Sequence, residues 1–119
     1  MPLSANSRAM KQWDILLFPF AAEGSHPAVI LSNDEHCSNP AFLYVNALLC
    51  TSIRVPRPAK RNEVILNGAD GLDWLTAVRC DAIHMLRKDQ FVTQRGTVSR
   101  ERRRAIGRKL IECFRLLDS

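Results

Sequence analysis

The sequence lacks the short patterns by which several large protein classes are recognised. Its four cysteines form no C-x-x-C pair, and no histidine stands at zinc-finger spacing from them, which argues against a structural zinc site. The patterns G-x-x-x-x-G-K-[ST], G-x-S-x-G and H-E-x-x-H are also missing, so the usual phosphate-binding loop, esterase elbow and zinc-protease helix are not expected. Any chemistry is therefore predicted to proceed without a metal or another cofactor.

Long apolar runs are missing as well. The opening stretch "MPLSANSRAMKQ" has no apolar core typical of a signal peptide, and no later segment approaches the length of a membrane span. Cys50, Cys80 and Cys113 stand in apolar surroundings and are predicted to be buried thiols. We therefore expect a cytoplasmic protein in a reducing compartment, without a membrane partner.

What the chain does contain is an ordinary globular composition with an excess of positive charge. The 119 residues include 46% hydrophobic and 24% charged side chains, which suits one domain with its own core. We assign residues 1–10 to a flexible N-terminal arm and residues 11–119 to a single domain. Lys and Arg outnumber Asp and Glu by 17 to 12, and the net charge of +5 favours an acidic partner such as nucleic acid or an acidic protein.

Short β-prone segments predict a mainly β fold with a helix at its end. Strands are expected at 13–20 (stopped by Pro19), 27–32, 41–52, 63–66 and 76–86, with a short strand pair possible around Gly96. The connections are too short for repeated crossover helices, so the sheet is expected to be antiparallel and strongly bent. Residues 99–117 have helical periodicity, with Ser99 as the N-cap and an apolar face formed by Ile106, Leu110, Cys113, Phe114 and Leu117.

The stretch "AVRCD" places opposite charges two residues apart, at Arg79 and Asp81. In a continuous strand both side chains would share one face. One interpretation is a solvated surface ion pair that contributes little to stability. The other is a functional pair, because Arg offers a planar fork of donors to a phosphate and Asp can accept a proton.

Three further features could act together with this pair. His26 precedes Pro27, which holds it in an extended backbone, and imidazole is the side chain that most readily changes charge near neutral pH. Thr51 and Ser52 end the longest predicted strand and either cap a turn or bind a phosphate. The loop that follows is cationic and is either a solvated surface or a track for a phosphate backbone, through Arg54, Arg57, Lys60 and Arg61.

Five segments, taken in order, resemble one known family. They are "WDILLFPF", "HPAVILSND", "VNALLCTS", "AVRCDAIHML" and the closing "GTVSRERRRAIGRKLIECFRLL". They are similar to the segments G-D-I, R-P-A-V with S-N-D, T-S, V-R-C-D and the amphipathic last helix of PemK/MazF-type toxins from bacterial toxin–antitoxin pairs. The resemblance covers residues 11–117 without large insertions.

The resemblance implies a compact SH3-like barrel with a C-terminal helix, usually as a homodimer. It implies a metal-independent endoribonuclease that cuts single-stranded RNA, often mRNA, at short specific sequences through attack of the ribose 2′-OH. An acidic antitoxin protein would cover the active groove.

The family's functional residues map onto this sequence one by one. Arg79 would stabilise the charge on the phosphorus oxygens and could also donate a proton, and Asp81 would act as the base or would orient the base. Thr51 is the expected phosphate contact, with Ser52 and Ser25 as further RNA contacts beside the cationic loop.

One family position differs in this chain. His26 stands where the family usually has a catalytic Arg, so it is predicted to replace that residue as an acid or base. Two other functions remain open for this fold: a CcdB-like gyrase poison that only binds protein, and a barrel that binds RNA without cutting it.

Overall fold

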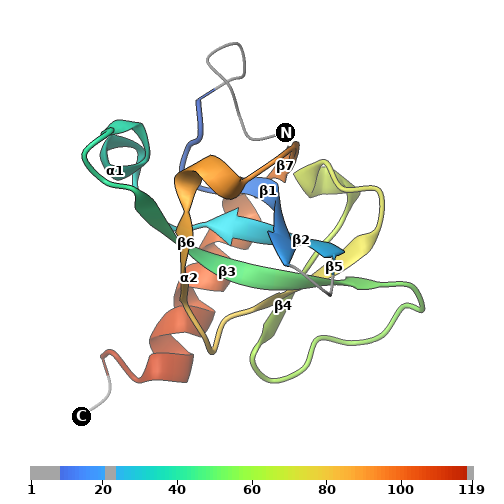
Figure 1. The fold of residues 1–119 in the computed structure, drawn as a ribbon. Helices are drawn as coiled ribbons and strands as arrows, with labels where there is room; N and C mark the ends of the chain where they lie inside the picture. Colours follow the sequence, from blue (N-terminus) through green and yellow to red (C-terminus); the bar gives the residue numbers. More distant parts are fainter. Residues whose placement is uncertain (1–8, 21–23, 118–119) are drawn as a thin grey trace.

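The structure is a computed structural model, and it describes residues 9–20 and 24–117 of the chain. Within these residues the elements are β1 (Asp14–Phe20), β2 (Gly24–Ile30), α1 (Asp34–Ser38), β3 (Tyr44–Ile53), β4 (Glu63–Leu66), η2 (Gly68–Asp70), β5 (Leu75–Arg79), β6 (His84–Arg87), η3 (Lys88–Gln90), β7 (Gln94–Thr97) and α2 (Arg100–Phe114). The predicted mainly β fold with a C-terminal helix is confirmed (Figure 1).

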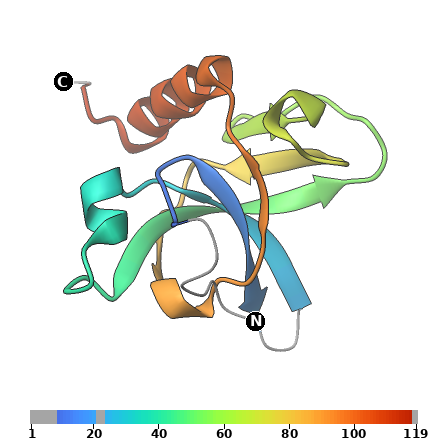
Figure 2. The ribbon, with the colours of Figure 1, turned by 90° about the horizontal axis from the view of Figure 1, so that it is seen from above.

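The strands form one curled antiparallel sheet in the order β4-β5-β3-β2-β1-β7. Strand β3 is the longest, and different parts of it pair with different neighbours. Residues 44–47 pair with β6, residues 47–49 pair with β2, and residues 50–53 pair with β5. The sheet therefore curls around β3, which crosses the whole molecule in both ribbon views (Figures 1 and 2).

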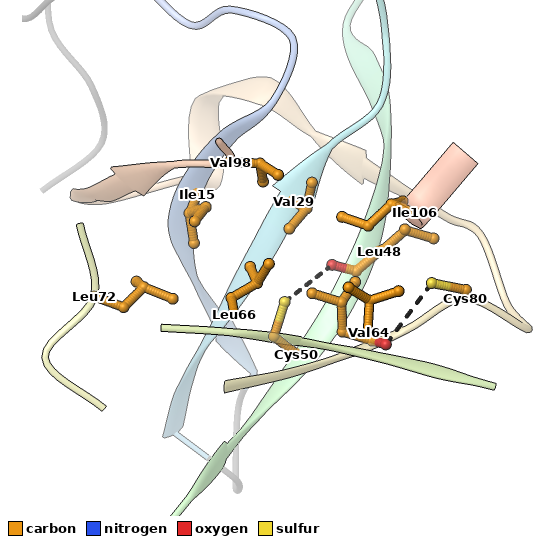
Figure 3. Packing of buried hydrophobic residues seen from close by; sticks show 11 residues of the cluster. Ile15, Val29, Leu48, Cys50, Val64, Leu66, Leu72, Cys80, Val98 and Ile106 are labelled. Atoms are coloured by element: carbon orange, nitrogen blue, oxygen red, sulfur yellow. Dashed lines mark hydrogen bonds between the residues drawn. The ribbon is translucent and has the colours of Figure 1, made fainter. Parts of the chain in front are cut away.

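The core consists of two apolar clusters that include alternate residues of the same strands. Ile15, Val29 and Leu48 belong to one cluster, together with Cys80 and Ile106. In the close view their side chains converge between the sheet and α2 (Figure 3). The second cluster takes the neighbouring positions, Leu16, Ala28, Ile30 and Ala47, together with Phe18 and Phe91. Period-two alternation thus leaves both faces of the bent sheet largely buried.

Helix α2 packs onto the core through Ile106, and partly through Leu110 and Cys113 further along. Ile106 is fully buried, whereas Phe114 is 41% and Leu117 is 82% exposed, so the predicted apolar face is only partly covered. Ser99 is the N-cap residue as expected, but its side chain makes no capping hydrogen bond. Its backbone N–H instead donates to Oδ1 of the buried Asp70 at 2.8 Å, which fixes the start of the helix against η2.

The prediction of a single strand over 76–86 is wrong. Strand β5 ends at Arg79 and β6 begins at His84, because β3 uses both segments as partners along different parts of its length. Residues 80–83 bridge the two strands. Cys80, in this bridge, is fully buried, as its apolar context predicted.

Smaller differences affect the first hairpin and the segment before α2. Strand β1 continues past Pro19, which pairs with Ser25, and β2 begins at Gly24, inside the stretch predicted to be a loop. The strand pair around Gly96 is not formed. Instead β7 is one short strand that pairs with β1 across a bulge, so the partner comes from the far end of the sequence.

The boundary of the packed domain lies before residue 11. Met10, which we placed in the arm, is only 8% exposed and belongs to the second core cluster. Residues 1–8 of the predicted arm lie outside the described residues.

Two glycines offer a matched test of the packing. At Gly96 a Cβ would overlap the backbone carbonyl of Asp70, whereas at Gly107 on α2 it would meet nothing within 4 Å. We expect Gly96→Ala to lower the free energy of unfolding by about 1–3 kcal/mol, the usual cost of overpacking, or to prevent folding. Gly107→Ala should raise it by about 0.5–1 kcal/mol. Thermal and urea unfolding measure both, and a neutral Gly96→Ala would contradict the close approach of β7 to η2.

Candidate active-site cleft

The register of the sheet decides which polar side chains share a face. Residues that stand opposite one another on antiparallel strands point to the same side. The β2–β3 ladder pairs Ala28 with Leu49, and extending that register by two residues places His26 across from Thr51. Both residues line the same cleft. Because β3 alternates, Thr51 and Leu49 share a face. His26 and Thr51 therefore lie on the same side of the sheet.

Strands β5 and β6, which pair with β3 at the edge opposite β2, place two more polar residues on the same face of the sheet. The β3–β5 ladder pairs Cys50 with Val78, and extending that register by one residue places Arg79 across from Leu49, which lines the same cleft. The β3–β6 ladder pairs Ala47 with His84. Since positions 47, 49 and 51 of β3 share a face, Arg79 and His84 join His26 and Thr51 there.

These side chains line a cleft of about 220 Å³ where β3 exchanges β6 for β5 as its partner. Its apolar walls come from Phe20, Leu49, Cys50 and Ala82, and its polar groups are His26, Thr51, Arg79 and His84. The ring of Phe20 lies 5.7 Å from that of His26 between centroids. Thr51, Arg79 and His26 are thus brought together as the resemblance predicted, from three different strands.

Arg79 and Asp81 form the ion pair that their spacing suggested, although Asp81 lies beyond the strand. The guanidinium Nη2 of Arg79 donates to Oδ2 of Asp81 at 3.0 Å and to Oδ1 at 3.2 Å, and Nε donates to Oδ1 at 3.3 Å. These bonds hold the pKa of Asp81 below its usual value, and Asn62 adds to the effect. Both side chains are partly solvated, yet Arg79 also lines the cleft. The pair is therefore a surface pair at the edge of the cleft.

The thiol beside the cleft is protonated near neutral pH. Cys50 is 2% exposed, and burial raises its pKa far above the usual range. Burial also raises the pKa of Cys80 to about 12 and that of Cys37 to about 11. A thiolate is needed for nucleophilic attack, so these cysteines serve as packing groups.

Ser25 and Ser52, which were predicted as RNA contacts, lie outside the cleft. Each is one residue from a cleft residue and so faces the opposite side of the sheet. Together they line a hollow of about 200 Å³ with Trp74 and Arg95. Alternation along β2 and β3 thus separates these serines from Thr51 and His26, and their role as RNA contacts stays a prediction.

The cationic loop 54–62 is only partly available to a ligand. Arg57 makes two hydrogen bonds to the buried carboxylate of Glu63, at 2.8 and 3.1 Å. These bonds lower the pKa of Glu63 and hold the guanidinium in place, so Arg57 is a structural residue rather than a free RNA contact. Arg54, Lys60 and Arg61 remain exposed.

Sequence reasoning missed the position of His84 in the cleft. In one continuous strand, residues 79 and 84 would face opposite sides, because their separation is an odd number. The break at residues 80–83 resets the alternation and returns His84 to the side of Arg79. No local sequence signal reveals that reset, since it depends on β3 exchanging β6 for β5 as its partner.

The described part of the chain holds neither a metal-binding cluster nor a membrane-spanning helix. Across residues 9–20 and 24–117, His, Cys, Asp and Glu side chains form no group of three or more with the spacing of a metal site. The helices in these ranges include none that is long and apolar enough to cross a membrane.

Solved structures of several toxins are similar to this fold. An endoribonuclease in complex with its cognate antitoxin, from a mycobacterial species, is 23% identical, with a TM-score of 0.73 over 91% of this chain and 97% of that chain. The Mycobacterium tuberculosis toxin MazF-mt6 is 18% identical, with a TM-score of 0.71 over 86% and 96%. A MazE–MazF structure from Deinococcus radiodurans is 19% identical, with a TM-score of 0.68 over 91% and 97%. No curated protein matches the chain.

The curled antiparallel half-barrel with its C-terminal helix is a MazF-like fold. The family model of PemK-like, MazF-like toxins of type II toxin–antitoxin systems matches residues 11–114. This chain belongs to that family.

Proposed function

We propose that this chain is the toxin of a toxin–antitoxin pair and that it cuts single-stranded RNA as an endoribonuclease. Membership of a family whose MazF toxins are endoribonucleases supports the activity. The observation that carries the proposal is the cleft, which gathers Arg79, Thr51 and His26 on one face. A cation, a hydroxyl and an imidazole around one small space are the groups that transesterification at phosphorus requires.

The proposed reaction uses the RNA as its own nucleophile. The ribose 2′-oxygen forms a bond to the adjacent phosphorus while the bond from phosphorus to the 5′-oxygen breaks, which leaves a 2′,3′-cyclic phosphate and a 5′-OH end. A base must take the proton of the 2′-OH, and an acid must supply one to the departing 5′-oxygen. No metal is needed for the step if the protein itself balances the growing charge on the phosphate oxygens.

The cleft residues divide these tasks. Arg79 provides the charge-assisted donors for the phosphate oxygens, and Thr51 provides a hydroxyl contact from β3. His26 stands at the edge of the cleft as an acid or base in place of the family's usual Arg. Asp81 accepts three hydrogen bonds from Arg79 and does not line the cleft, so we assign it to orienting the guanidinium.

The RNA backbone is proposed to leave the cleft past Asp81. On that side a hollow of about 550 Å³ is lined by Lys60, Arg61 and Arg115 as well as Asp81. Arg115, at the C-terminal cap of α2, was not foreseen as a candidate, because only the fold brings the helix end beside the loop. These three cations could each contact a successive phosphate of the RNA backbone. We therefore expect the affinity for RNA to fall as the salt concentration rises.

The direct test incubates the purified protein with a long single-stranded RNA in EDTA and maps the 5′ ends of the products. The proposal predicts discrete cuts at a short recurring sequence, with 5′-OH ends. Binding of RNA without cleavage would instead support a barrel that binds RNA but does not cut it. Gyrase inhibition without RNA cleavage would support a CcdB-like gyrase poison.

The partner that restrains the toxin is proposed to be an acidic antitoxin protein. Solved structures of similar toxins include complexes with antitoxin. The net charge of +5 and the exposed Arg54, Lys60 and Arg61 offer an anionic polypeptide the same surface that RNA would use. Antitoxin and RNA should therefore compete.

We also propose a homodimer that uses the end of α2, where Ile111, Phe114, Leu116 and Leu117 are exposed. Four exposed apolar residues within seven positions would be covered by the same segment of a second copy. Phe114→Glu should raise the dimer dissociation constant by at least about tenfold, because a desolvated charge opposes association. Sedimentation velocity measures this, with Glu112→Gln as the control on the same helix. A monomeric wild type would contradict the proposal.

A cytoplasmic location is proposed from the thiols. Cys37, Cys50, Cys80 and Cys113 are all free, as suits a reducing compartment.

A further inference from the structure

The cleft holds two imidazoles, one at each edge of β3. His26 belongs to β2, which pairs with one edge, and His84 belongs to β6, which pairs with the other edge at Ala47. Both line the cleft that contains Thr51 and Arg79. Two titratable rings therefore flank the space where a phosphate would lie, and they approach it from opposite sides of the same strand.

The other groups that face this space are poor partners for proton transfer. Arg79 remains charged, and the pKa of its guanidinium is raised further by Asp81. Burial raises the pKa of Cys50 far above its usual range, and the β1 neighbour of His26 is the ring of Phe20. Among the described residues, no carboxylate lines the cleft, and that of Asp81 is directed at Arg79.

We propose that His26 and His84 are the acid–base pair of the RNA-cleaving reaction, and that Asp81 is a positioning residue for Arg79. The inference rests on the proposed endoribonuclease function and names the residues that move protons in it. Imidazole is suited to the task because it both accepts and donates a proton near neutral pH.

Two histidines can supply both proton transfers of the reaction, and no other reagent is needed. A neutral imidazole takes the proton of the 2′-OH as the 2′-oxygen binds phosphorus. An imidazolium on the other side gives its proton to the 5′-oxygen as the bond from phosphorus to that oxygen breaks. In an in-line displacement the attacking and leaving oxygens lie on opposite sides of phosphorus. The two histidines come from strands that pair with opposite edges of β3, so one can serve each oxygen. Water then exchanges the protons and restores both rings.

Single-turnover cleavage of single-stranded RNA between pH 5 and 9 tests the pair. Wild-type protein should give a bell-shaped rate profile, since one ring must be neutral and the other charged. His26→Gln and His84→Gln should each reduce the rate by about 10²–10⁴-fold, the usual contribution of a positioned acid or base. Loss of the base should remove the acidic limb of the profile, and loss of the acid should remove the alkaline limb.

A second measurement uses the wild-type protein and needs no variant. Added inorganic phosphate should shift the NMR signals of the His26 and His84 rings. The signal of His36 should stay in place, because that ring lies in α1, stacked on Phe42 and 2.8 Å from the carbonyl oxygen of Tyr44.

Failure of the histidine pair and failure of the endoribonuclease activity would give different results. A wild type that cuts RNA while His84→Gln keeps its rate within about twofold would overturn the pair and leave the endoribonuclease intact. So would loss of the same limb in both variants, or phosphate that shifts neither cleft ring. A wild type that cuts no RNA would overturn the proposed function and the pair with it.

Discussion

Arg79→Ala is expected to reduce the rate of RNA cleavage by about 10²–10³-fold, the usual cost of removing one preorganised donor to a developing oxyanion. Arg79 is the only permanent cation among the residues of the cleft that the structure describes. Its three hydrogen bonds to Asp81 hold the guanidinium in a fixed orientation before substrate arrives. The loss should fall mainly on kcat, because the phosphate gains charge only as the reaction proceeds.

A second variant at Arg79 and a control elsewhere show whether cleavage needs the planar guanidinium or only its positive charge. Arg79→Lys keeps the charge but loses the bidentate geometry, so we expect it to recover only part of the rate. Arg87→Ala is the matched control, since Arg87 makes a similar pair with Asp89 two residues away, at 3.0 Å, outside the cleft. It should cleave as wild type does. Full activity in Arg79→Ala would exclude the cleft as the reaction site.

Asp81→Asn is expected to reduce kcat by roughly tenfold to a hundredfold, a smaller loss than that of Arg79→Ala. Asparagine keeps the size of the side chain but removes the charge that aligns the guanidinium, and small misplacements of a catalytic group cost up to about 10²-fold. Asp89→Asn, in the matched pair, should leave cleavage unchanged. Cleavage by Asp81→Asn should also keep both limbs of its pH profile, because Asp81 orients Arg79 and transfers no proton.

The lowered pKa of Asp81 predicts that this carboxylate does not change charge over the pH range in which cleavage is measured. Because Arg79 lowers this pKa in the folded protein, the pair is fully formed above the ordinary pKa of Asp, and it is lost only as the pH falls through the lowered value. No titration of Asp81 is expected between pH 5 and 8. A limb of the rate profile in that range that disappeared in Asp81→Asn would reassign the base to Asp81.

The strand segments were predictable because each has a local signal. "PAVIL" and "EVIL" are compact apolar runs, and both are strands in the structure. The last helix was predictable from its period, although the exposure of Phe114 and Leu117 was not, because periodicity does not say what covers a face.

The composition of the cleft was predictable only in part. The sequence singled out His26, Thr51, Arg79 and Asp81, because unusual polar residues in β-prone segments are visible without a fold. It did not reveal that alternation turns Ser25 and Ser52 to the other face, or that Glu63 holds Arg57. Both facts depend on strand pairing and folding, whereas a linear pattern records neighbours along the chain and not across it.

By itself, then, the amino-acid sequence determined the mainly β class, the closing helix, the family resemblance and the residue types that carry the proposed chemistry. Local propensity and order along the chain are enough for those conclusions. Only the tertiary structure decided that β5 and β6 are separate strands, that His84 returns to the side of Arg79, and that Asp81 turns to Arg79 rather than into the cleft. The physical reason is that β3 pairs with different strands along its length, and a change of partner leaves no local mark in the sequence.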